Sequence, residues 1–174
     1  MKKDGIILLN KVKGISSFKA INQIKWNIGA SKIGHAGTLD PMAEGLMVVM
    51  VNSATKFSED LMKKDKEYYV EMELGYETDT YDAEGKKTKI YDGIIEYDEQ
   101  NVRDVINSFV GIQDQIPPMY SALKVNGRKM YEMAREGIEI ERKPRRVEIY
   151  SIRDITIKGK RITFYVEVSS GTYI

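Results

Sequence analysis

The pattern of apolar and polar residues along this chain predicts short strands that alternate with amphipathic helices. Apolar residues stand next to one another from Ile6 to Leu9, which predicts a short buried strand. From Tyr68 to Leu74 apolar and polar residues alternate, which is typical of a strand with one exposed face. The predicted strands are 6–9, 46–51, 68–74, 147–157 and 162–168, with a turn at 158–160 between the last two.

A spacing of three and four residues between apolar positions predicts the first helix. Ser16 or Ser17 caps its N-terminus and Gly29 ends it. Its apolar side chains fall on one face: Phe18, Ile21, Ile24 and Ile28.

Three later helices follow from the same signals. One lies around 55–63, and one around 128–135 has Gly137 as its C-cap. Between them, Asp98 caps a helix that Gly111 stops and that carries Val102, Val105, Ile106 and Phe109. Residues 75–85 have the polar composition of a loop, and Pro117 begins an extended segment.

These elements predict an α+β fold, with a mixed, mainly antiparallel sheet flanked by helices. The sequence contains no internal repeat, no low-complexity segment and no linker. We therefore expect one domain over residues 1–174, a length that can bury a sizeable core.

Composition narrows the chemistry that this chain can perform. Apolar content of 42% and charged content of 30% are ordinary for a soluble globular protein, and no apolar run is long enough to cross a bilayer. The chain has no cysteine, which excludes disulfides, a thiolate nucleophile and a cysteine zinc site. The only histidine is His35, which argues against a histidine-rich metal site. We expect a cytoplasmic protein without a metal.

Charge is distributed unevenly, although the formal net charge is only +1. Residues 1–58 carry eight basic and three acidic side chains, and residues 123–161 carry twelve basic and six acidic. Residues 59–104 carry seven basic and fifteen acidic, so they should face away from any nucleic acid. Basic surfaces attract phosphates, which makes Arg142, Lys143, Arg145 and Arg146 candidate RNA-backbone contacts. A solvated surface with no partner is the simpler interpretation of that cluster.

The strongest candidate for chemistry is Asp40, in the glycine-rich run Gly34 to Leu46. Pro41 fixes the backbone just after the acid and disfavours the α conformation at Asp40 itself. An acid in a stiff loop at the edge of a strand is a common way to build a site. An Asp-Pro turn that merely enters a strand would give the same pattern.

This run resembles the catalytic motif of the TruB family of tRNA pseudouridine synthases, Gly-His-x-Gly-x-Leu-Asp-Pro-x-Ala-x-Gly-x-Leu. Every fixed position of that pattern is present here. Four more segments resemble family motifs, in the family's order and over essentially the whole chain: Lys66-Glu67-Tyr68, Gly75 to Asp82, Pro117 to Lys124 with Gly127 and Tyr131, and Gly171-Thr172-Tyr173-Ile174.

The resemblance implies the pseudouridine synthase catalytic domain of an enzyme that isomerises uridine 55 in the TΨC arm of tRNA. The reaction breaks the N1–C1′ glycosidic bond, turns the base and rejoins it through C5, so it needs no metal or organic cofactor. Asp40 is then the catalytic carboxylate, which traps or stabilises a cationic centre as carboxylates do in glycosidases. We expect tRNA as the partner and a monomer.

The resemblance also assigns substrate-binding residues. Tyr68 would stack on the target base and help to remove the C5 proton, and His35 would fill the space that the flipped base leaves. Asp82 would lie near the site, and Tyr173 would contact the substrate. From the residues alone, a tyrosine in a strand is more simply a packing residue, and a lone histidine is more often structural.

Two departures from the family pattern stand out. The usual Asp-Lys-Pro-x-Gly-x-Thr-Ser is replaced by the segment Asn10 to Ser17, which lacks the acid and the proline and has serine for threonine. These changes are expected to be tolerable in a structural turn. The sequence given ends at Ile174, before the arginine that pairs with the catalytic aspartate in the family and before a small C-terminal RNA-binding domain. We expect an incomplete catalytic domain.

Other functions remain open at this point. A guide-RNA-dependent relative of the family would share the motifs, and a fragment without the arginine could bind RNA without catalysis. A glycosidase would need a second carboxylate near Asp40, for which Glu44 is the nearest acid in the sequence. A calcium site at Asp79, Asp82 and Glu84 is disfavoured because the EF-hand loop pattern is absent.

Overall fold

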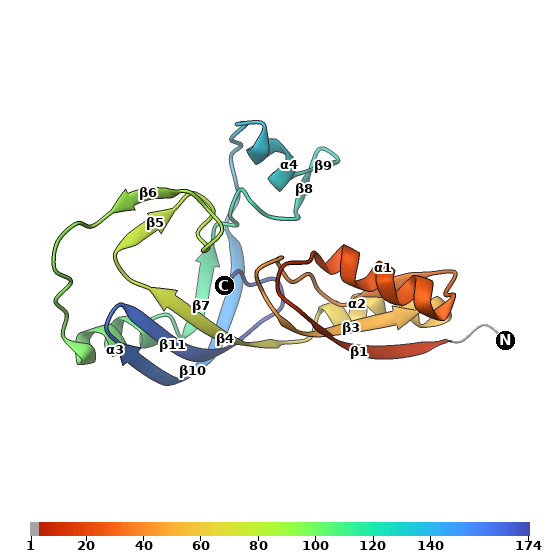
Figure 1. The fold of residues 1–174 in the computed structure, drawn as a ribbon, viewed down its shortest axis with the longest axis horizontal. Coiled ribbons are helices and arrows are strands. Elements are labelled where there is room, and N and C mark those ends of the chain that lie inside the picture. Colours follow the sequence, from red (N-terminus) through yellow and green to blue (C-terminus); the bar gives the residue numbers. More distant parts are fainter. Residues whose placement is uncertain (1–3) are drawn as a thin grey trace. The chain divides into compact units, whose positions relative to one another are not determined.

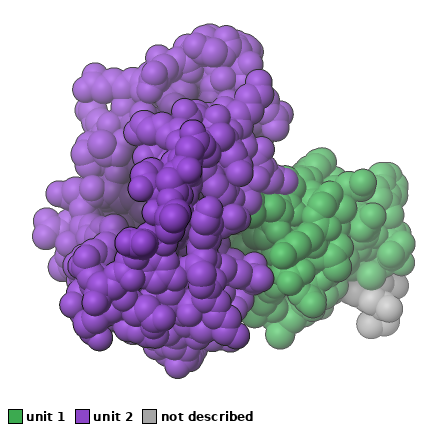
Figure 2. Space-filling model, turned by 60° about the vertical axis from the view of Figure 1, so that its left-hand side comes forward, with its two compact units in different colours: residues 1–64 green, residues 65–174 purple. Residues whose placement is uncertain are grey.

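The computed structural model describes residues 4–174, which fold into two compact units. Figure 2 colours unit 1, residues 1–64, green and unit 2, residues 65–174, purple. Each unit has its own β-sheet, and all strand pairs among the described residues are antiparallel. The predicted α+β class with a mainly antiparallel sheet is confirmed.

Unit 1 is a three-stranded sheet with helices on it (Figure 1). The strand order is β1-β3-β2, so β3 lies in the centre, and its register pairs Gly5 with Val51 and Lys11 with Gly45. The elements of this unit are β1 (Gly5–Lys11), α1 (Ser17–Ile28), β2 (Ile33–His35), β3 (Gly45–Val51), the 3₁₀ helix η1 (Asn52–Phe57) and α2 (Ser58–Met62).

The core of unit 1 forms on both faces of β3. Met47 and Val49 pack with Ile21 of α1, while Met50 packs with Ala54 on the other face. The prediction of a buried strand at 6–9 is wrong in one respect. As an outer strand, β1 alternates, and its Ile6 and Leu8 side chains are 51% and 69% exposed.

Helix α1 begins and ends where the sequence predicts. The Ser16 side chain accepts a hydrogen bond from the backbone N–H of Lys19, and Gly29 closes the helix with a φ of +63°. The predicted apolar face is wrong at Phe18 and Ile28, which are 70% and 38% exposed. The buried positions of this helix are Ser17, Ala20 and Ile21.

Unit 2 is built on a four-stranded sheet of order β4-β11-β10-β7. Strands β10 and β11 are the two C-terminal strands expected from the sequence, joined at the predicted turn. Two small hairpins, β5–β6 and β8–β9, extend from this sheet (Figure 1). The elements are β4 (Lys66–Glu73), β5 (Tyr76–Thr78), β6 (Lys87–Ile90), α3 (Glu99–Asn107), β7 (Gly111–Gln115), β8 (Lys124–Val125), β9 (Arg128–Lys129), α4 (Met130–Arg135), β10 (Arg145–Lys158) and β11 (Arg161–Val168).

The alternation predicted for β4 is confirmed, since every second residue from Lys66 onward is half-buried. Asp98 caps α3 as predicted, by accepting from the backbone N–H of Asn101 at 2.9 Å. Gly111, however, does not stop a helix. It is the first residue of strand β7, with a φ of +118°, and α3 ends at Asn107. The polar segment 75–85, predicted to be a loop, contains β5.

Candidate active site

The backbone before Asp40 is held by a buried serine. Ser17, the first residue of α1, donates from Oγ to the carbonyl of Leu39 at 2.8 Å and accepts from the Leu39 N–H at 2.9 Å. Only 3% of Ser17 is exposed. The residue that precedes the acid is therefore fixed to the helix by both of its backbone polar groups.

The backbone after Asp40 is held by a buried lysine. Lys11, at the end of β1, is 1% exposed, and its Nζ donates to the carbonyls of Val12 at 3.1 Å, Ile15 at 2.9 Å and Pro41 at 3.4 Å. The Pro41 carbonyl also accepts from the Gly14 N–H at 2.8 Å. A buried ammonium is tolerated only with such partners, so the loop and the β1–α1 turn form one hydrogen-bonded structure.

Between these two anchors, Asp40 is exposed. Its carbonyl accepts from the Ala43 N–H at 3.1 Å, so a tight turn brings the chain to β3. A carboxylate on anchored backbone can act on a substrate without first reorganising the loop. The structure therefore shows an Asp-Pro turn that leads into β3 and whose backbone is anchored on both sides of the acid.

His35 is the last residue of β2 and pairs with Val49 in the register of the sheet. Its ring is half-buried, and Nδ1 lies 2.5 Å from the carbonyl oxygen of Gly37. Because a carbonyl can only accept, Nδ1 carries the proton in this contact. The ring is thus held against its own loop, five residues before Asp40 in the sequence.

Tyr68 lies on the half-buried face of β4, where it pairs with Val166 of β11. Lys66 lies two residues earlier on the same face. Burial lowers the pKa of Lys66, and the negative charge of Asp65 opposes that shift. An aromatic ring and an amine therefore share one side of this strand.

Tyr173 is clamped by a glutamine from β7. Gln115 accepts from the Tyr173 N–H at 2.9 Å and donates from Nε2 to the Tyr173 carbonyl at 2.8 Å. Ser169 fastens the start of the same segment to β10, since its N–H donates to the Glu148 carbonyl and its Oγ accepts from the Glu148 N–H. The segment that follows β11 is thereby fixed to β10 and β7.

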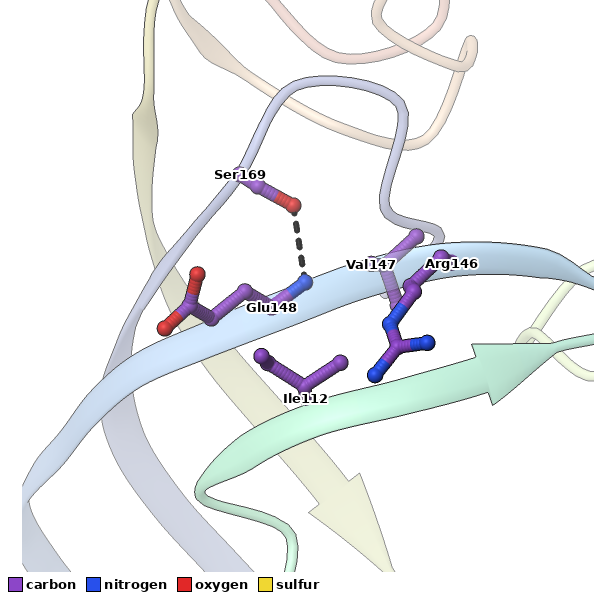
Figure 3. A pocket seen from close by; sticks show the side chains of 5 residues that line it. All are labelled: Ile112, Arg146, Val147, Glu148 and Ser169. Carbon is purple, nitrogen blue, oxygen red and sulfur yellow. Dashed lines mark hydrogen bonds between the residues drawn. The ribbon is translucent and has the colours of Figure 1, made fainter.

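Beside this segment lies a shallow pocket of about 260 Å³ (Figure 3). Figure 3 shows the Ser169–Glu148 hydrogen bond at one side of it and the Arg146 guanidinium near Ile112 at the other. The residues that line it are Ile112, Arg146, Val147, Glu148 and Ser169. Arg146, a member of the predicted basic cluster, therefore borders this pocket.

Asp82 accepts hydrogen bonds that hold its own loop together. Its Oδ1 accepts from the Thr80 hydroxyl at 2.6 Å and from the Glu84 N–H at 2.9 Å, and its carbonyl accepts from the Thr78 hydroxyl at 2.7 Å. Gly85 completes the packing, because a Cβ there would lie 2.2 Å from Thr80 Oγ1. Within residues 4–174 no group of three acidic or histidine side chains could hold a metal ion, so the calcium interpretation has no support.

The basic cluster divides into two kinds of residue. Arg142 donates to the Pro117 carbonyl at 3.3 Å and lies 3.4 Å from the Glu139 carboxylate, with only 20% of its side chain exposed. Lys143, Arg145 and Arg146 are exposed. Arg145 pairs in register with Gln115, the residue that clamps Tyr173.

The predicted site residues are thus shared between the two units. His35 and Asp40 lie on one loop of unit 1. Unit 2 carries Tyr68, Asp82, Tyr173 and the basic cluster. None of the helices among the described residues is long and apolar enough to span a membrane.

Comparison with known proteins shows which family this chain resembles. Residues 25–174 match the model of the TruB family pseudouridylate synthase, N-terminal domain. The chain belongs to the TruB family. A tRNA pseudouridine synthase B from Fusobacterium nucleatum is 47% identical over 98% of this chain and 59% of its own length. The same protein from Clostridium kluyveri is 44% identical over 98% of this chain and 58% of its own length.

Solved structures agree with membership of the TruB family. A crystal structure of a Cbf5–Nop10–Gar1 complex contains a chain with a TM-score of 0.73 and 29% identity, over 98% of this chain and 41% of that one. A structure of an H/ACA RNP bound to a substrate RNA containing 2′-deoxyuridine gives a TM-score of 0.67 at 25% identity, over 97% and 39% of the two chains. This chain spans less than two thirds of the length of these relatives.

The sequence alone did not identify the residues that hold the Asp40 loop and the Tyr173 segment. Lys11 and Ser17 lie in the segment with the departures from the family pattern, and they hold the loop on both sides of Asp40. The serine that replaces threonine, Ser16, still caps α1. Gln115 stands 58 residues from Tyr173 and has no local signal.

Proposed function

We propose that this chain carries the catalytic centre of a tRNA pseudouridine-55 synthase, with Asp40 as the catalytic carboxylate. The observation that carries the proposal is the double anchoring of the Asp40 loop, by Ser17 before the acid and Lys11 after it, around an exposed carboxylate. The names of the bacterial relatives, tRNA pseudouridine synthase B, support tRNA as the substrate.

The chemistry requires little beyond a positioned carboxylate. The N1–C1′ bond of the uridine breaks, the base turns, the C1′–C5 bond forms, C5 loses a proton and N1 gains one. Because atoms and electrons balance, no oxidant or reductant is required. Asp40 would stabilise or trap the electron-poor centre that appears when the bond breaks. Tyr68 would stack on the flipped target base, as the family resemblance implies.

Substitution of the carboxylate tests the proposal. Asp40→Asn should abolish tritium release from a 5-tritiated TΨC stem-loop while RNA binding stays within a few-fold, since a neutral amide of the same shape cannot act as nucleophile or stabilise a cation. Glu44→Gln is the matched control, because Glu44 is an exposed acid on the same loop. Activity of Asp40→Asn within tenfold of wild type would contradict the assignment.

We also propose that the exposed part of the basic cluster binds the RNA backbone. The double substitution Arg145→Ala with Arg146→Ala should reduce the slope of log affinity against log salt by roughly 0.7–0.9 for each phosphate that is no longer neutralised. Lys158→Ala with Lys160→Ala, at the opposite end of β10, is the control and should leave the slope unchanged. Equal slopes for the two doubles would mean that Arg145 and Arg146 form a solvated surface only.

The second candidate is a guide-RNA-dependent pseudouridine synthase, favoured by the structural similarity to the Cbf5 chain of a multi-protein complex. The higher identity to the bacterial relatives supports a stand-alone, monomeric, cytoplasmic tRNA enzyme instead. Turnover of an unmodified tRNA transcript by the purified protein, with no guide RNA added, distinguishes the two. Activity that appears only with a guide RNA would favour the second candidate.

A further inference from the structure

The outward side of α1 carries the only tryptophan in the chain. Trp26 is 81% exposed, and Phe18 at the start of the same helix is 70% exposed. The buried side is formed by Ser17, Ala20 and Ile21, so the 3.6-residue period directs Trp26 away from the core. Single exposed apolar residues are common on protein surfaces. A tryptophan on the side of a helix opposite its buried side is less common and suggests a binding surface.

The charged side chains of α1 are all basic. Lys19 precedes Trp26 by seven residues, two helical turns, and therefore lies on the same side of α1. Lys25 is the neighbouring residue, and α1 contains no acidic side chain. Aromatic rings interleaved with lysines suit nucleic acid, because rings stack on bases while ammonium groups approach phosphates.

Helix α1 is connected to the proposed active site by hydrogen bonds from its buried side. Ser17 in the first turn holds Leu39, the residue before Asp40, by two hydrogen bonds of 2.8 and 2.9 Å. Trp26 lies nine residues farther along the helix, a distance of about 14 Å at 1.5 Å per residue. An RNA arm with its target base at Asp40 extends well beyond that length.

We propose that the outward side of α1, formed by Phe18, Lys19 and Trp26, is an RNA-binding surface that contacts the substrate tRNA outside the target loop. The inference rests on the proposed function and extends the RNA contacts beyond the flipped base. RNA is the occupant because the helix offers two ammonium groups and no carboxylate, which matches a polyanion. A second copy of this chain would meet the same positive charge and be repelled.

The single tryptophan allows a direct measurement. Unmodified tRNA transcript is titrated into the Asp40→Asn protein, which holds substrate without turnover, and the emission of Trp26 is followed. The emission should be quenched with the same Kd that a filter-binding assay gives. In the wild-type background, Trp26→Ala should weaken tRNA binding about 5- to 100-fold, the usual range for loss of a stacked ring, and Trp26→Phe should retain most of the affinity.

Phe57→Ala is the matched control, since Phe57 is another exposed aromatic residue of unit 1 with a lysine beside it, Lys56 Nζ at 5.0 Å from the ring centroid. It should bind tRNA like the wild type. The melting temperature of Trp26→Ala should be unchanged or slightly raised, because alanine is the better helix former and little packing is removed.

Emission that stays constant while filter binding shows saturation with tRNA would overturn the inference. So would emission that changes with protein concentration in the absence of RNA, which would indicate a protein–protein surface. A wild-type chain that forms pseudouridine without any response of Trp26 would leave the proposed function standing and remove this surface. Quenching by tRNA without pseudouridine formation would do the reverse.

Discussion

Two loops of this molecule carry an aspartate in a turn, and they are stabilised in opposite ways. The Asp40 loop is held by side chains 22 and 30 residues away, Ser17 and Lys11, while Asp40 itself is exposed. The Asp82 loop is held by its own side chains, and Asp82 Oδ1 accepts two of the hydrogen bonds. In the first loop other residues hold the backbone beside the acid. In the second loop the acid itself holds the backbone and side chains around it.

Substitutions should therefore have different effects in the two loops. Removal of Asp40, which other residues hold in place, should lower turnover more than stability. Removal of Lys11 or Ser17, which hold its loop, should lower both turnover and stability. Where an acid is the support, its removal should loosen the loop first. Each of the following substitutions separates these two cases by measuring stability and turnover on the same protein.

The largest effect is expected for Lys11→Met, which keeps the length of the side chain and removes the ammonium. The carbonyls of Val12 and Ile15 lose a donor in a buried setting, which should lower the free energy of unfolding by about 2–3 kcal/mol. Turnover of the folded protein should fall about 100-fold, because a small displacement of the acid is costly. Urea unfolding and single-turnover rates check both values.

Lys13→Met is the control for the lysine substitution, since Lys13 is exposed on the same turn. It should change stability by no more than about 0.5 kcal/mol. A Lys11→Met protein as stable and active as Lys13→Met would show that the buried ammonium does not position the loop.

A smaller effect is expected for Ser17→Ala, which removes both hydrogen bonds to Leu39. Unfolding free energy should fall by about 1–2 kcal/mol, and turnover should fall about tenfold. Ser16→Ala removes only the helix cap and should cost about 1 kcal/mol with turnover unchanged. Equal turnover in the two neighbouring variants would mean that the hydrogen bonds to Leu39 serve stability alone.

The turn at Asp40 is the part of the candidate site with the strongest local signal in the sequence, for a physical reason. Glycines, the proline and the acid lie close together in the chain, so one local run predicts the turn and suggests the chemistry proposed for it. The cap at Ser16 and the end of α1 at Gly29 were predicted correctly, because capping depends on residues within one turn.

The residues that hold these segments could not be predicted from the sequence. Some contact residues far away in the chain, and one is a buried residue of a type that is usually exposed. A lysine in a polar turn is expected at the surface, and only the carbonyls around it make burial of Lys11 tolerable. Gln115 meets Tyr173 only when β7 joins the sheet. Strand β7 itself was missed because Gly111 has the appearance of a helix stop and is instead the positive-φ start of a strand.

The Asp82 loop should respond in the opposite way to the Asp40 loop. Asp82→Ala removes the acceptor for Thr80 and Glu84 and should lower unfolding free energy by about 1 kcal/mol, more than Asp40→Ala does. Asp82→Asn keeps an acceptor oxygen and should be closer to wild type in stability. A loss of stability from Asp40→Ala as large as that from Asp82→Ala, measured by urea unfolding, would remove the distinction between the loops.

The smallest expected effect comes from Tyr81, which the Asp82 loop holds at a φ of +63°. A bulky L-residue in this region costs about 1–2 kcal/mol, while a glycine there costs only the extra entropy of its unfolded chain, about 0.5–1 kcal/mol. Because the Tyr81 side chain is 77% exposed, truncation removes little packing. Tyr81→Gly should therefore stabilise the protein by about 0.5–1 kcal/mol in thermal and urea unfolding. Glu84→Gly, at an exposed residue of the same loop, should instead destabilise it.

The strain at Tyr81 persists only while the surrounding hydrogen bonds fix the loop, so its relief should depend on Asp82. In an Asp82→Ala background the loop can relax, and Tyr81→Gly should then bring no gain in stability. The double-mutant cycle measures this dependence as an interaction free energy of about 0.5–1 kcal/mol between two residues that share a loop. Additive effects would mean that the hydrogen bonds of Asp82 do not impose the backbone conformation of Tyr81. The loop would then be held by the hairpin on either side of it, much as the Asp40 loop is held from outside.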